Sequence, residues 1–72
     1  MVNSRRLKAA IILAGYTQAE LAEAASMSKN ALNAKINGRS DFRLDEIDTL
    51  CRLLTIEKDE DKAQIFLSQI SQ

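Results

Sequence analysis

Apolar residues recur along this chain at the three- and four-residue spacing of helices, in five separate segments. The clearest stripe belongs to a predicted helix over about residues 44–54 and consists of Leu44, Ile47, Leu50, Cys51 and Leu54. Weaker stripes predict further helices over about residues 3–14, 17–25, 29–37 and 59–71. In the first of these, the expected inner face consists of Leu7, Ala10, Ile11 and Ala14. Phe42 is the one apolar residue of the polar loop before the fourth helix, and we expect it to be buried. The pattern therefore predicts an all-α fold, a compact five-helix bundle within one domain over residues 1–72.

Local signals mark the ends of these helices. Thr17 and Glu20 stand three residues apart, the spacing of a capping box in which each side chain accepts a hydrogen bond from the other residue's backbone. Ser28 is suited to cap the next helix. Asn37 followed by Gly38 is a strong stop signal, so the second and third predicted helices are short.

Composition agrees with a helical chain. Proline is absent, glycine occurs twice, and 46% of the 72 residues are apolar, which is typical of a globular chain rather than a disordered one. A chain of this length has little room for a deep substrate pocket. Cys51 is the single cysteine and histidine is absent, so neither an internal disulfide nor a common set of metal ligands is available. We expect no enzyme activity, no metal and no cofactor.

The chain also lacks the patterns of membrane insertion and export. No segment reaches the roughly 18 consecutive apolar residues of a membrane helix. The apolar stretch from Ala9 to Ala14 is too short for a signal peptide. We therefore expect a cytoplasmic protein without a membrane partner.

Charge is unevenly distributed, although ten basic residues balance ten acidic ones. Up to Arg43 the chain has seven basic residues against three acidic ones, and after Arg43 it has three against seven. The net charge of zero is thus the sum of +4 and −4. Such an asymmetry suggests that the first part meets a polyanion, with chance segregation of solvated charges as the alternative.

The second and third predicted helices have the pattern of a helix-turn-helix. Ala22 is small enough for the two helices to cross closely, and Leu32 is an apolar residue that would lock them together. The second helix of such a motif presents polar side chains at its N-terminal end to the major groove of DNA. Lys29, Asn30 and Asn33 meet this requirement.

These features resemble the lambda-repressor-like, or Xre-type, DNA-binding domains, and especially short phage-encoded regulators. The matching residues are Leu7, the run from Gly15 to Ala22, Ser28, Leu32, Ile36, Asn37, Gly38, Phe42, the run from Leu44 to Ile47, and Leu54. The helix-turn-helix would cover about residues 17–37. The chain departs from the family at Ser26, where relatives have a turn glycine, and a side chain at positive φ there costs about 1 kcal/mol.

The resemblance implies DNA contacts for Gln18, Ser28, Lys29, Asn30, Asn33, Ala34, Lys35, Asn37, Arg39 and Arg43. Gln18 resembles the glutamine that holds a DNA phosphate in this family. Lys29 and Asn30 match its first base-reading positions, and Asn33 and Ala34 match later ones. Lysine can donate to guanine, and asparagine can pair with adenine through two hydrogen bonds.

The remaining residues of this set would position the DNA backbone without reading sequence. Ser28, Arg39 and Arg43 fit this role. Asn37 is first of all a residue that ends a helix. Lys35 replaces an apolar residue of many relatives, and it is either a phosphate contact or a solvated flank.

The fifth predicted helix carries Ile65, Phe66, Leu67 and Ile70, more apolar surface than a terminal helix needs for packing. Members of the resembled family bind near-palindromic operators as symmetric dimers. We therefore expect a homodimer through these four side chains. The alternative is that all four complete the core of one copy.

Together these observations favour a sequence-specific transcriptional regulator that binds double-stranded DNA. The resemblance implies a phage or prophage repressor or Cro-like protein whose third helix enters the major groove of an operator. One alternative is an antitoxin or a restriction-control protein that uses the same motif. Another is a protein-interaction module that keeps the fold without binding DNA.

Overall fold

The computed structural model describes residues 2–70, and the side chains of that stretch as far as residue 66. Within this range it has five helices and no strand: α1 (Ser4–Leu13), α2 (Gln18–Ala24), α3 (Lys29–Ile36), α4 (Leu44–Leu53) and α5 (Asp59–Ile70). The predicted all-α fold is confirmed. Each helix begins and ends within one residue of its predicted bounds.

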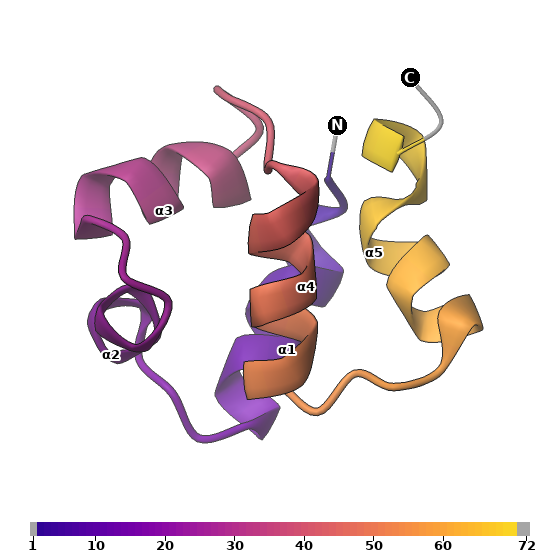
Figure 1. Ribbon diagram of the computed structural model, residues 1–72, viewed down its shortest axis with the longest axis horizontal. Helices are drawn as coiled ribbons and strands as arrows, with labels where there is room; N and C mark the ends of the chain where they lie inside the picture. The colour runs from indigo at the N-terminus through magenta and orange to yellow at the C-terminus, as the bar shows by residue number, and fades with distance from the viewer. Residues whose placement is uncertain (1, 71–72) are drawn as a thin grey trace.

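The five helices are arranged around a central pair, α1 and α4 (Figure 1). α1 and α4 occupy the middle, α2 and α3 lie to one side, and α5 lies to the other. α1 packs against both α3 and α5, while α2 packs against α3. The backbone N–H of Asn3 donates to the carbonyl of Ile65 at 2.8 Å, which ties the start of the chain to α5.

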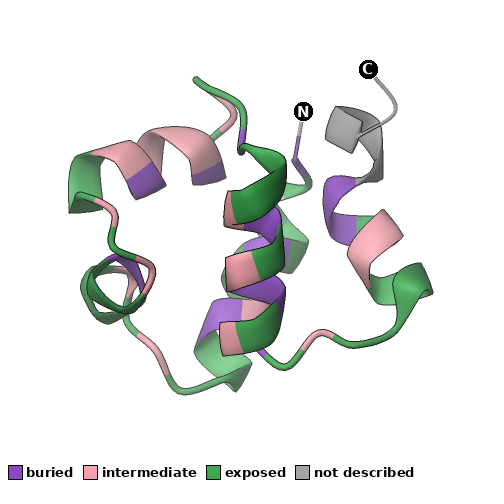
Figure 2. Ribbon diagram, viewed as in Figure 1, coloured by how far each residue is buried: buried purple, intermediate pink, exposed green. Residues whose placement is uncertain are grey.

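All five helices contribute buried apolar side chains to one core (Figure 2). The largest fully buried residues are Leu7, Leu21, Leu32, Ile36, Leu50 and Phe66. Phe42 is buried as predicted, and its ring meets the edge of Phe66 with centroids 5.8 Å apart. Cys51 is buried as well. Burial raises the pKa of its thiol, which fits the role of a small apolar filler.

The C-terminal ends of α1 to α4 all form a Schellman motif, in which the residue after the C-cap has positive φ. Gly15 and Gly38 occupy this position after α1 and α3. Ser26 has φ 57° after α2, which is the strained turn expected from the sequence. Thr55 has φ 56° after α4, and a β-branched residue adopts this conformation less readily than serine does.

Two predicted core positions at the ends of helices were wrong. Leu44 is the first residue of α4 and is 70% exposed. Ala14 is the C-cap of α1 and is also exposed. An apolar stripe can extend beyond the turns that neighbouring helices cover, and periodicity alone does not show where that cover ends.

The expected dimer surface on α5 is corrected at two of its four positions. Ile65 is 7% exposed and Phe66 is fully buried. The reason is that α5 packs on α1 and that the Phe66 ring meets Phe42. These side chains are used within one copy and are not available to a second. The other two positions, Leu67 and Ile70, lie outside the described side chains.

We expect Thr55→Gly to raise the free energy of unfolding by about 0.5–1 kcal/mol. Glycine removes a left-handed penalty of about 1–2 kcal/mol, partly offset by its greater freedom in the unfolded chain. The matched control is Thr49→Gly inside α4, which should lower the free energy of unfolding by about 0.5 kcal/mol. Urea titrations followed by circular dichroism measure both values. A loss of stability in Thr55→Gly would contradict the strain.

Candidate nucleic-acid interface

The turn between α2 and α3 spans residues 25–28 and is closed by backbone hydrogen bonds. The N–H of Met27 donates to the carbonyl of Ala22 at 2.8 Å, and Ser26 has the positive φ at which the chain changes direction. Ala22 is 2% exposed and Leu32 is fully buried. Both residues are therefore part of the core, and α2 packs directly on α3, as the helix-turn-helix pattern requires.

The N-terminal ends of α2 and α3 are capped as predicted. The Glu20 N–H donates to Thr17 Oγ1 at 3.1 Å, and the Thr17 N–H donates to Glu20 Oε1 at 2.9 Å. The Ala31 N–H donates to Ser28 Oγ at 3.0 Å. Ser28 serves here as an acceptor, so its own hydroxyl hydrogen is still available to a ligand oxygen.

The first turn of α3 presents polar side chains to solvent. Lys29 and Asn30 are both exposed, and neither makes a side-chain hydrogen bond or ion pair with a residue that the structure describes. Gln18, half-buried at the start of α2, is likewise without such a partner in the described range. These three side chains can form hydrogen bonds with a ligand without breaking bonds within the protein.

The second turn of α3 is more constrained. Asn33 and Ala34 are half-buried. The Asn37 side-chain amide donates to both the backbone carbonyl and the Oδ1 of Asn33, each at 3.0 Å. Asn37 therefore ends α3 and also fixes the carboxamide of Asn33, whose NH₂ group stays available for other acceptors.

The cations near α3 differ in how firmly they are held. Lys35 Nζ lies 2.6 Å from Oε1 and 2.7 Å from Oε2 of Glu46, and both side chains are mostly buried. Arg43 Nε lies 3.3 Å from Asp45 Oδ1, but these side chains are 75% and 72% exposed. An exposed pair of this kind contributes about 0–1 kcal/mol, so Arg43 can exchange Asp45 for another anion. Arg39 is exposed and has no such partner among the described residues.

Comparison with protein families agrees with this geometry. A family model described as helix-turn-helix matches residues 7–60, three quarters of the chain. The chain belongs to the lambda-repressor-like, Xre-type helix-turn-helix family. It is a DNA-binding transcription regulator. Searches of curated proteins and of solved structures gave no match.

Two residues of this helix-turn-helix regulator that hold α3 were not predicted from the sequence. The hydroxyl of Ser4 donates to the backbone carbonyl of Ile36, the last residue of α3. The carboxylate of Glu46 accepts both from Lys35 and from the Arg43 N–H. Ser4 and Ile36 are 32 positions apart, and helical periodicity carries no information about such a pair. For Glu46, the nearest signal is its place three residues after Arg43, which is the spacing of a capping box.

Glu46 is ionised more readily in the folded protein than in a free peptide. Burial acts to raise the pKa of its carboxyl, but hydrogen bonds from the Arg43 N–H and the Lys35 ammonium more than offset this. The net result is a pKa below the ordinary value of 4.5. A lowered carboxyl pKa stabilises the fold at pH values above the unfolded-state pKa, and that stabilisation is lost as pH falls through the folded-state value.

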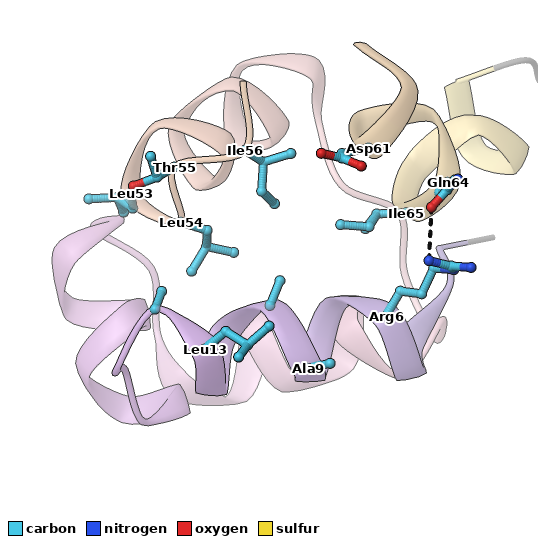
Figure 3. A pocket seen from close by; sticks show the side chains of 12 residues that line it. Arg6, Ala9, Leu13, Leu53, Leu54, Thr55, Ile56, Asp61, Gln64 and Ile65 are labelled. Atoms are coloured by element: carbon cyan, nitrogen blue, oxygen red, sulfur yellow. Dashed lines mark hydrogen bonds between the residues drawn. The ribbon is translucent and has the colours of Figure 1, made fainter. Parts of the chain in front are cut away.

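The regulator also has a groove of about 530 Å³ between α1 and the segment that joins α4 to α5 (Figure 3). Leu13 and Ile56 contribute apolar surface, and at one end Arg6 donates to Gln64 at 2.8 Å. No residue of α2 or α3 lines it. The groove is therefore separate from the candidate interface.

No helix in the described part of the chain is long and apolar enough to cross a lipid bilayer.

We expect the stability difference between the wild type and Glu46→Gln to shrink as pH falls from 5 to 3. Glutamine cannot ionise, so the variant lacks the stabilisation that the wild type loses when Glu46 is protonated. Urea titrations at pH 7, 5, 4 and 3 give the two free energies of unfolding. A difference that stays constant with pH would show that the charge of Glu46 contributes nothing to the fold.

Proposed function

We propose that this protein is a sequence-specific repressor or Cro-like regulator of a phage or prophage. It would bind double-stranded operator DNA in the cytoplasm of a bacterium or a phage-infected host. The observation that supports sequence reading is the first turn of α3, where Lys29 and Asn30 are exposed, unpaired within the described range, and directly follow the helix-turn-helix turn. This is the part of a recognition helix that meets base edges in the major groove.

In this proposal α3 is the recognition helix. Lys29 donates to O6 and N7 of guanine, and Asn30 forms two hydrogen bonds with N6 and N7 of adenine. Asn33 reads a further base with its free NH₂ group while Asn37 holds it in place. The methyl group of Ala34 contacts a thymine methyl. The recognition surface is thus short and rich in amide groups.

Contacts to phosphates would surround this surface. Gln18, the Ser28 hydroxyl, Arg39 and Arg43 supply donors on either side of α3 and fix the protein on the DNA backbone without reading sequence. Lys35 has no part in this set, because Glu46 binds its ammonium group. One copy therefore neutralises few phosphates.

We propose further that two copies bind one near-palindromic operator. Affinity for DNA at physiological salt rises with the number of phosphates neutralised, and a single copy of this size has few cations to offer. A symmetric dimer doubles that number and places two recognition helices about one turn of DNA apart.

A protein-interaction module is the second candidate function. Ile12 and Leu13 are 74% and 87% exposed on α1, and the net charge of the chain is zero. Titration of the protein with a random DNA duplex at 25 mM to 200 mM salt separates the two functions. Affinity that falls steeply with salt supports DNA binding, whereas absence of binding at low salt supports the interaction module.

We expect Asn30→Ala and Lys29→Ala each to relax base preference at one position of the operator half-site, at a cost of about 1–3 kcal/mol. The measurement is selection of bound sequences from a random DNA pool, which also reports two-fold symmetry. Lys58→Ala is the matched control, because it removes an exposed lysine next to α5. If Asn30→Ala left the selected sequences unchanged, α3 would not be the base-reading helix.

We expect the molar mass measured by light scattering to rise from one copy toward two with increasing concentration, or on addition of a palindromic operator duplex. The reason is that one copy makes too few phosphate contacts to hold an operator alone. A mass of one copy at all concentrations, together with binding of one copy per duplex, would rule out the dimer.

A further inference from the structure

Lys35 and Glu46 form a direct link between the recognition helix α3 and the first turn of α4. The ammonium of Lys35 donates to both carboxylate oxygens of Glu46, at 2.6 and 2.7 Å. Only 16% and 18% of the two side chains are exposed. Water and salt therefore compete less for this pair than for an ordinary surface pair.

Glu46 is itself held in place. Its Oε1 atom accepts a hydrogen bond from the Arg43 N–H at 2.8 Å, immediately before α4 begins. The neighbouring Ile47 and, one turn further, Leu50 are buried in the core. The carboxylate is thus a fixed point on α4 against which α3 can be oriented.

The C-terminal end of α3 is held by few elements of the fold, so a fixed contact there restrains its orientation. α3 has eight residues, about two turns, and its backbone packs against α2 and α1. An exposed loop follows it from Arg39 to Asp41. Ser4 holds the last carbonyl of α3 from the side of α1. Lys35 ties the same end to α4, so two polar contacts from two different helices restrain the C-terminal end of α3.

We propose that Glu46 and Lys35 are positioning residues that hold α3 at a fixed angle and thereby set how selectively the protein binds its operator, without contact between Lys35 and the DNA. This inference rests on the proposed role of α3 as the base-reading helix. In this proposal Lys35 serves to bind Glu46 and not a DNA phosphate.

The test uses the full chain and the best operator that the wild type selects from a random pool. We compare the ratio of the random-duplex Kd to the operator Kd in the wild type and in Glu46→Gln. Glutamine still accepts from the Arg43 N–H but lacks the charge that binds Lys35. We expect Glu46→Gln to bind random duplex more tightly, because it gains one positive charge near the phosphates. Its ratio should nevertheless fall about tenfold, comparable to losing one base contact.

Asp45→Asn is the matched control. It makes the same change of charge one residue earlier on α4 but leaves the Lys35–Glu46 pair intact. We expect this variant to tighten binding to both duplexes together, so that its ratio stays at the wild-type value. If Glu46→Gln and Asp45→Asn gave the same ratio, the positioning role would be overturned.

Lys35 provides the second arm of the test. Lys35→Met should lower the ratio of random-duplex Kd to operator Kd. Lys35→Arg keeps the ion pair and should have the wild-type ratio. The slope of log affinity against log salt should be the same for Lys35→Met and the wild type, since a phosphate contact would reduce it by about 0.9. A reduced slope would overturn the proposal. Circular dichroism at the assay temperature verifies folding, and if Glu46→Gln unfolds, the two Lys35 variants decide.

These outcomes separate the two levels of inference. A wild type that binds random duplex but selects no sequence overturns the proposed function together with the positioning role. A wild type that selects an operator, with Glu46→Gln and Lys35→Met as selective as the Asp45→Asn control, overturns the positioning role alone.

Discussion

A short helix that presents one face to DNA can be attached to its protein only through the other face. α3 has eight residues, and Leu32 and Ile36 are its only members that are fully buried. Two apolar anchors on one stripe resist separation from the core better than they resist rotation about the stripe. The polar contacts of Ser4 and Glu46 add two further restraints at the C-terminal end of α3. α3 is thus attached to the rest of the protein by a combination of apolar and polar contacts.

The short turn that joins α2 to α3 requires a strained backbone conformation at Ser26. The chain changes direction within residues 25–28, and Ser26 adopts a positive φ in this turn. Ala22 contributes little apolar area, but it is buried in the same core as Leu32, where α2 and α3 pack against each other. The capping box at Thr17 and the cap at Ser28 then satisfy N–H groups at the start of both helices. Local backbone chemistry thus builds the motif, and the core fixes it.

Much of this could be predicted from the sequence, because helix stripes, caps and stop signals are local. The capping box, the Ser28 cap and the burial of Phe42 follow from residues within a few positions of one another or from one apolar residue in a polar loop. The link from Ser4 to Ile36 joins residues far apart in the chain, and no periodicity encodes it. The sequence predicts a dimer surface at Ile65 and Phe66 for the same reason, since their partners, among them Phe42, come from distant segments of the chain.

The distribution of charge along the chain differs from the distribution of charge around α3 in the folded protein. The first part of the chain carries +4 and the remainder −4, but Glu46 comes from the acidic part and neutralises Lys35 of the basic part. The acidic first turn of α5 lies on the other side of the molecule from α3, where the N-terminal end of the helix stabilises it. The positive charge near α3 is therefore smaller than the count along the chain suggests. Under the proposed function, selectivity then depends on where Lys29 and Asn30 are placed, and this is the property that we propose the Lys35–Glu46 pair protects.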